Sequence, residues 1–216
     1  MSQRKIINCI ENRVSNFESG ELNFLDLSKY KDSIKDNDYF DFIITSGNGG
    51  FFYNQSLQIY GYSQLYNYND IESVNSLLKK EYENIFAGLI SFAQDLFGNQ
   101  FCFDVANKGI VFFDVETGAK DHIATNFSNW TDVLTERLQY FTGINVLEAW
   151  LLNNHLSFNQ RLCPKIPFLM GGEFNVDNLY ASVFPNSIKA YANIARQVYD
   201  LPDGTPIKLN IGSKPA

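Results

Sequence analysis

The spacing of apolar residues along the chain predicts several amphipathic helices. Residues 3–17 place isoleucine, valine and phenylalanine three or four positions apart, which is the repeat of one helix face. A second helix, capped by Asp36 or Asn37 and ended by Gly47, is predicted next. Its inward residues are expected to be Phe40, Ile43 and Ile44. Further helices are expected over residues 71–78, 126–141, 146–152 and 185–198.

Short apolar runs between turn residues predict strands. They cover residues 51–53, 57–62, 85–92, 100–105, 110–115 and 205–211. Asn54-Gln55-Ser56 and Asn107-Lys108-Gly109 are expected to be hairpin connections. The order of helices, then strands, then helices favours an α+β fold, with a mostly antiparallel sheet flanked by helices, over alternating βαβ units. No repeat or linker interrupts the pattern, so we expect residues 1–216 to form a single domain.

Composition and charge narrow the classes of partner. The net charge is −7, and residues 41–130 carry −6 of it, with four Lys/Arg against ten Asp/Glu. An acidic chain does not suit binding to nucleic acid, which needs a basic face. It suits a basic protein partner such as the catalytic domain of a nuclease, although many ordinary cytosolic proteins are equally acidic.

The residues that usually carry chemistry are sparse. Three cysteines and two histidines stand far apart, so neither a disulfide framework nor a zinc site is indicated. The glycines of residues 47–50 lack the Lys-Ser/Thr of a phosphate loop and are interpreted as a turn. We therefore expect no metal, no cofactor and no catalytic activity. The first residues contain no apolar run typical of a signal peptide, and no stretch is long enough to span a membrane, so a cytoplasmic protein is expected.

Carboxylates are the remaining candidates. Asp104, Asp114, Glu116 and Asp121 cluster around the second predicted hairpin. Such acids can serve a hydrolase or hold a hard cation, or they can be solvent-facing residues at strand ends, and no spacing-specific motif selects the first alternative. As part of a negatively charged face, they are candidate contacts for a partner.

Tyrosines are the second set of candidate contacts. Tyr62 and Tyr66 lie in a run of tyrosines beside two acidic residues, and tyrosine is common in protein interfaces. The same residues can equally serve packing within the sheet and its loops.

Several segments, in order and in register, resemble the SMI1/KNR4 superfamily, also called SUKH. Residues 42–50 (FIITSGNGG) resemble its helix followed by an Asn-Gly-Gly turn. Residues 92–104 (FAQDLFGNQFCFD), 111–118 (VFFDVETG) and 124–130 (ATNFSNW) resemble its central hairpin and the entry to the next helix. The resemblance covers a core of about residues 30–141. The segment of residues 142–216 resembles an extension seen in some bacterial members, through residues 171–179 (GGEFNVDNL) and 195–204 (ARQVYDLPDG).

What this resemblance implies is a role without catalysis. Many bacterial members resemble immunity proteins, which bind a cognate toxin of a polymorphic or contact-dependent system, often a nuclease, inside the producing cell. Eukaryotic members resemble regulatory scaffolds, which is the alternative function. A carboxylate hydrolase assembled from distant residues is a third. The sequence indicates no oligomeric state.

Overall fold

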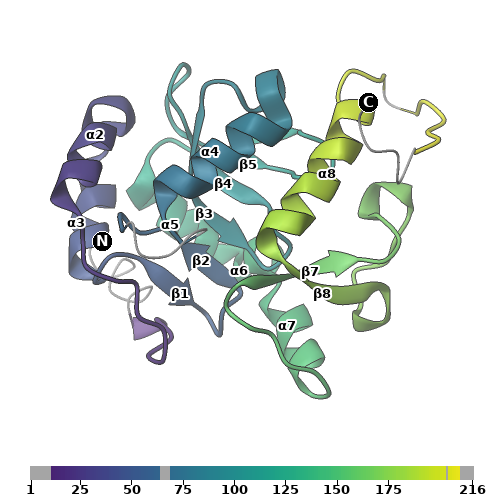
Figure 1. Cartoon of the computed structure of the whole chain (residues 1–216), viewed down its shortest axis with the longest axis horizontal. Coiled ribbons are helices and arrows are strands. Elements are labelled where there is room, and N and C mark those ends of the chain that lie inside the picture. The colour runs from purple at the N-terminus through teal and green to yellow at the C-terminus, as the bar shows by residue number, and fades with distance from the viewer. Residues whose placement is uncertain (1–10, 64–68, 203, 210–216) are drawn as a thin grey trace.

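The computed structural model describes residues 11–63, 69–202 and 204–209. Within them, the central element is a six-stranded antiparallel sheet in which each strand pairs with the next along the chain (Figure 1). Its strands are β1 (Gly50–Phe52), β2 (Leu57–Ile59), β3 (Leu89–Asp95), β4 (Gln100–Asp104), β5 (Ile110–Phe113) and β6 (Lys120–Ala124). A separate two-stranded sheet pairs β7 (Gln160–Pro164) with β8 (Leu179–Val183). The predicted α+β class with a mostly antiparallel sheet is confirmed.

Helices cover both faces of the six-stranded sheet. They are α2 (Phe24–Ile34), α3 (Asn37–Thr45), α4 (Ile71–Tyr82), α5 (Phe127–Glu136), α6 (Leu138–Thr142), α7 (Ile144–Leu151) and α8 (Phe184–Val198). Three short 3₁₀ segments are η1 (Glu83–Phe86), η2 (Phe168–Met170) and η3 (Val176–Asn178). Helices α4 and α8 lie against each other across one face (Figure 1).

Neighbouring residues of β5 show how the core is divided between the two faces. Successive side chains of a strand point to opposite sides. The Phe113 ring packs on Tyr82 of α4 with its centroid 5.1 Å away, and the Phe112 ring packs on Phe141 of α6 at 5.5 Å. On the α5 side, Trp130 is fully buried against aromatic rings of β3 and β4.

Local sequence signals placed several elements correctly. The β4–β5 hairpin turns through Gly109, whose φ of +101° is disfavoured for other residues. Asp36 caps α3, and α8 begins with Pro185 in its first turn. The expected helix over residues 126–141 is two helices, α5 and α6, which join at Arg137. The expected strand over residues 85–92 begins later, because η1 and a turn at Gly88 precede β3.

Other predictions were wrong where tertiary contacts override periodicity. In the described part of residues 3–17, Arg13 bridges to Phe52 and the Val14 N–H donates to the Phe51 carbonyl oxygen at 2.8 Å. Residues 3–10 lie outside the described residues and Glu11 is helical, so pairing with the edge of β1 replaces only the last part of the expected helix. Ile44 was expected to point inward but is 48% exposed. The buried face of α3 includes Tyr39 and Phe42, and Ile44 lies outside this face.

The C-terminal part contains the remaining differences. Residues 204–209 form no strand, and residues 210 and 211 lie outside the described part of the chain. Instead, β7 and β8, which the pattern did not predict, form a hairpin-like pair beside α8 (Figure 1). Helix α2 and strand β6 were also missed, because both are largely polar and exposed.

A buried arginine anchors β7 to the central sheet. Arg161 is 1% exposed, and its guanidinium donates to the side-chain oxygen of Gln58 on β2 and lies over the Phe51 ring at 5.1 Å. The side-chain amide of Gln94 on β3 lies 2.6 Å from that of Gln58. Because a buried guanidinium needs polar partners, these two glutamines fix the position of β7 beneath the sheet.

Candidate functional site

The four candidate carboxylates do not form one cluster. In the β4–β5 pair, Phe103 lies opposite Ile110 and Gln100 lies opposite Phe113. Asp104 therefore stands at the tip of this hairpin, whereas Asp114 and Glu116 follow the opposite end of β5. Asp121 is exposed on the edge strand β6, opposite Phe112 and therefore nearer to Asp114 than to Asp104.

Asp104 and Asp114 organise turns. One carboxylate oxygen of Asp104 accepts from the N–H groups of Ala106 at 3.0 Å and Asn107 at 2.9 Å. Asp114 accepts in the same way from Glu116 at 2.9 Å and Thr117 at 2.8 Å. Partial burial would raise the pKa of Asp104, but its hydrogen bonds outweigh burial and lower it. Both side chains are partly exposed, and these bonds fix them in place.

Glu116 is buried, whereas the sequence predicted that it belongs to a negatively charged face on the surface. It is 5% exposed, and its two oxygens accept from the N–H groups of Phe168 at 3.1 Å and Leu169 at 3.0 Å. Burial raises the pKa of Glu116, although these N–H groups partly oppose the shift. The Glu116 carboxylate thus satisfies the first N–H groups of η2, which have no partner within that short helix.

Tyr62 is likewise buried, which contradicts its interpretation as a contact residue. It is fully buried, and its hydroxyl lies 3.2 Å from that of Tyr39. Of the two alternatives for the tyrosines, packing is therefore confirmed at this position. Tyr66 lies outside the described residues.

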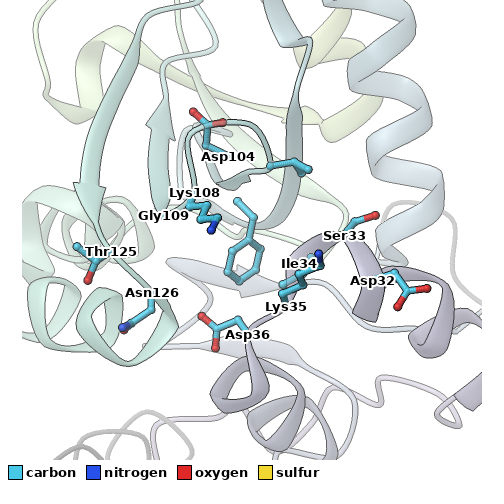
Figure 2. Close-up of a pocket in the computed structure, with 12 residues that line it drawn as sticks. Asp32, Ser33, Ile34, Lys35, Asp36, Asp104, Lys108, Gly109, Thr125 and Asn126 are labelled. Carbon is cyan, nitrogen blue, oxygen red and sulfur yellow. The ribbon is translucent and has the colours of Figure 1, made fainter.

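A cavity of about 340 Å³ opens at the tip of the β4–β5 hairpin (Figure 2). It lies where the α2–α3 junction, the hairpin tip and the β6–α5 junction meet. Asp104 stands on the hairpin side, and Asp36 and Asn126 stand on the opposite side (Figure 2). The remaining lining residues are Asp32, Ser33, Ile34, Lys35, Phe103, Val105, Lys108, Gly109 and Thr125.

One carboxylate holds the helical side of this cavity together. Lys35 ends α2 in a left-handed conformation with φ of 53°. Asp36 then accepts from Tyr39 N–H at 3.1 Å, which caps α3, and from Phe127 N–H at 2.7 Å, which caps α5. A single negative charge thus satisfies the N-termini of two helices, where the helix dipoles favour it. Its capping of α3 was visible in the sequence, whereas its bond to α5 joins residues 91 positions apart.

The cavity combines fixed carboxylates with apolar surface. Its acids are Asp32, Asp36 and Asp104, and two of these three hold backbone N–H groups. Its apolar surface comes from Ile34, Phe103 and Val105, of which Val105 is 42% exposed. Among its lining residues, no hydroxyl is hydrogen-bonded to a histidine or carboxylate as a nucleophile and base would be. Apolar surface ringed by fixed charges is typical of a protein contact.

Two further kinds of site are absent from the described residues. Across the described residues, no three His, Cys, Asp or Glu side chains gather in a way that could hold a metal ion. None of the helices described above is both long and apolar enough to cross a membrane.

Comparisons with protein families and with solved structures both find proteins similar to this chain. Residues 36–132 match the model of the SMI1 / KNR4 family (SUKH-1). The crystal structure of Atu4351 from Agrobacterium tumefaciens has a similar fold, with a TM-score of 0.59, 16% sequence identity and alignment over 83% of this chain and 84% of that chain. No curated protein matches the sequence significantly. The cavity at the hairpin tip is lined largely by residues of the matched segment, and this segment, residues 36–132, belongs to the SMI1/KNR4 (SUKH) superfamily.

Proposed function

We propose that this protein is an immunity protein that binds a cognate bacterial toxin and neutralises it without catalysis. The toxin would be a basic, nuclease-like domain of a polymorphic or contact-dependent system. The proposal places the complex in the cytoplasm of the producing cell, where such a toxin has to be blocked. The observation that carries it is the SMI1/KNR4 membership of residues 36–132.

The geometry of the carboxylates supports binding over catalysis. A general acid or base needs a proton to exchange with substrate, and its pKa is usually tuned toward the working pH. Asp36, Asp104 and Asp114 instead use their oxygens to hold backbone N–H groups. They act as fixed negative charges, which is the property that attracts a basic partner.

The uneven charge supports a basic partner. Residues 41–130 carry a net charge of −6, with four basic and ten acidic residues. Concentrated charge of one sign speeds the encounter with an oppositely charged protein, and salt weakens this effect. An acidic inhibitor can also occupy the basic cleft in which a nuclease binds the phosphate backbone.

The direct test is co-expression with the toxin domain encoded beside this gene. We expect a stable complex on affinity purification and rescue of growth when the toxin is induced. Absence of both complex and rescue would refute the proposal. Association with several unrelated partners, without rescue, would instead support a regulatory scaffold.

Matched charge reversals test the role of the acidic segment. Asp121→Lys and Glu148→Lys change the net charge equally at exposed positions, but only Asp121 lies in the acidic segment. We expect Asp121→Lys to slow association at low salt by about tenfold and Glu148→Lys to change it little. Equal effects of the two variants would show that the acidic segment, residues 41–130, does not speed association with the partner.

A further inference from the structure

A second cavity, of about 140 Å³, lies at the other end of the sheet, between β7, the turn after it and α8. Its apolar walls include Pro164, Pro167, Ala190 and Ile194. Cavities of roughly this volume hold a group the size of a benzene ring. Most of its lining comes from the C-terminal segment outside the family match, and Glu116 joins it from the matched segment.

An unsatisfied phenol lines this cavity. Tyr191 is 5% exposed, and its hydroxyl, which adjoins the weakly hydrogen-bonding Cys163 thiol, makes no hydrogen bond of good geometry within the described chain. Buried polar groups are nearly always paired, since an unpaired one loses its hydration without compensation. The hydroxyl of Tyr191 therefore marks a place for a polar group that is not part of this chain.

The same cavity contains a buried carboxylate without a counter-charge. Glu116 accepts two backbone N–H groups, but no described basic side chain forms an ion pair with it. Lys165, the basic residue of the lining, donates its Nζ to the Asp177 carbonyl oxygen at 2.7 Å. Burial is the main cause that raises the pKa of Tyr191, and the neighbouring Cys163 and Glu116 raise it further, so Glu116 and Tyr191 share one electrostatic environment. A buried carboxylate of this kind favours a cation beside it.

The polar atoms of the cavity are mainly hydrogen-bond acceptors, so they suit a ligand that donates hydrogen bonds. Ser187 donates its hydroxyl to the Phe184 carbonyl oxygen at 2.7 Å, so its oxygen is left to accept. The oxygens of Glu116 accept as well, and the Tyr191 hydroxyl can do either. At the edge, Tyr180 is 46% exposed and offers a ring face, on which a guanidinium stacks well.

We propose that this cavity receives the side chain of an arginine from the toxin, with its guanidinium placed between Tyr180, Tyr191 and the Glu116 carboxylate. This assignment rests on the proposed function, which supplies a basic partner. A guanidinium presents several donors in one plane and is weakly hydrated, so it suits a narrow cavity with several acceptors better than an ammonium does. The segment that follows β7 also carries exposed apolar side chains, which are available to a partner: Ile166, Met170 and Phe174.

The test titrates the full-length protein with n-propylguanidinium and, separately, with n-butanol as an uncharged probe of similar size, followed by NMR. We expect n-propylguanidinium alone to shift the resonances of Cys163 and Tyr191. No shift, or equal shifts with n-butanol, would overturn the assignment. If binding fails while the toxin is still neutralised, only this inference falls; if n-propylguanidinium binds and the toxin is not neutralised, the proposed function falls.

Three variants and one control localise the binding. Tyr191→Phe should weaken n-propylguanidinium about fivefold and Glu116→Gln about tenfold or more, because a charge-assisted bond is lost. Glu116 also holds η2, so a third variant, Ala190→Leu, fills the cavity from the exposed face of α8 without changing Glu116 and should abolish binding. Glu173→Gln removes an exposed charge from the same segment and should leave affinity unchanged. Undiminished binding by Tyr191→Phe and Ala190→Leu would refute the site.

Discussion

Asp95 should make the stability of this protein depend on pH near neutrality. It ends β3 and is 3% exposed. Its carboxylate accepts from the N–H groups of Phe97 and Asn99, each at 2.8 Å, and from the Asn99 side chain at 2.9 Å. Burial nevertheless dominates and raises the pKa of Asp95 to about 7, despite these bonds and the positive charge of Arg161.

The direction of the effect follows from where the proton is held. The pKa of Asp95 is higher in the folded state than in the unfolded chain, so the folded state binds the proton more tightly. Its favourable contribution is fully present below the unfolded-state pKa of about 4 and is lost as pH rises to about 7. At about 1.4 kcal/mol per unit, this removes roughly 2 kcal/mol of unfolding free energy between pH 5 and pH 7.

The assay is urea unfolding of the wild type and Asp95→Asn at several pH values from 5 to 8. Asparagine keeps an acceptor oxygen for the turn but does not ionise. Between the lowest and highest pH, the unfolding free energy of Asp95→Asn should therefore fall by roughly 2 kcal/mol less than that of the wild type. Asp104→Asn is the control, since the lowered pKa of Asp104 puts its titration at acidic pH. Identical pH slopes for the wild type and Asp95→Asn would refute the reasoning.

Three further substitutions test other features by urea unfolding. Tyr191→Phe should raise the unfolding free energy by about 1 kcal/mol, because it removes a buried hydroxyl without a partner. Arg161→Ala should lower it by about 3–5 kcal/mol, since the polar groups around the guanidinium lose their buried partner. Asp36→Ala should lower it by about 1–2 kcal/mol through two lost helix caps, whereas the exposed Asp38→Ala should change it by less than about 0.5 kcal/mol.

The outcomes that contradict these expectations differ. A loss of stability in Tyr191→Phe would mean that its hydroxyl is satisfied in solution. A small effect of Arg161→Ala would mean that β7 does not depend on this anchor. Equal effects at Asp36 and Asp38 would mean that capping of α3 and α5 contributes little.

The parts of the fold that the sequence predicted are those with local causes. The β4–β5 hairpin follows from a turn that ends in glycine, and α8 follows from its apolar repeat after Pro185. Strand β6 was missed because only the last of its residues is buried, so its sequence shows no apolar alternation. Helix α2 was missed because its first two residues, Phe24 and Leu25, are exposed, which hides its buried face.

The candidate site was predicted less well, since it depends on contacts between distant segments. The separation of Asp104 from Asp114 was implicit in the predicted hairpin, which places them at opposite ends. The burial of Glu116 was not, because it depends on the N–H groups of η2 more than 50 positions away. Both cavities are lined by segments far apart in the chain, and no local sequence pattern predicts that such segments lie together.

The anchoring of β7 by Arg161 has a consequence for how relatives of this protein diverge. Gln58 and Gln94 are tolerated inside the sheet because Arg161 occupies the space beside them. A relative that loses the arginine would remove the buried donor of the Gln58 side-chain oxygen and open a space beside both amides, so we expect these three positions to change together across homologues. Exchange of the C-terminal segment between lineages by recombination would then succeed only when the matching residues of β2 and β3 are exchanged with it.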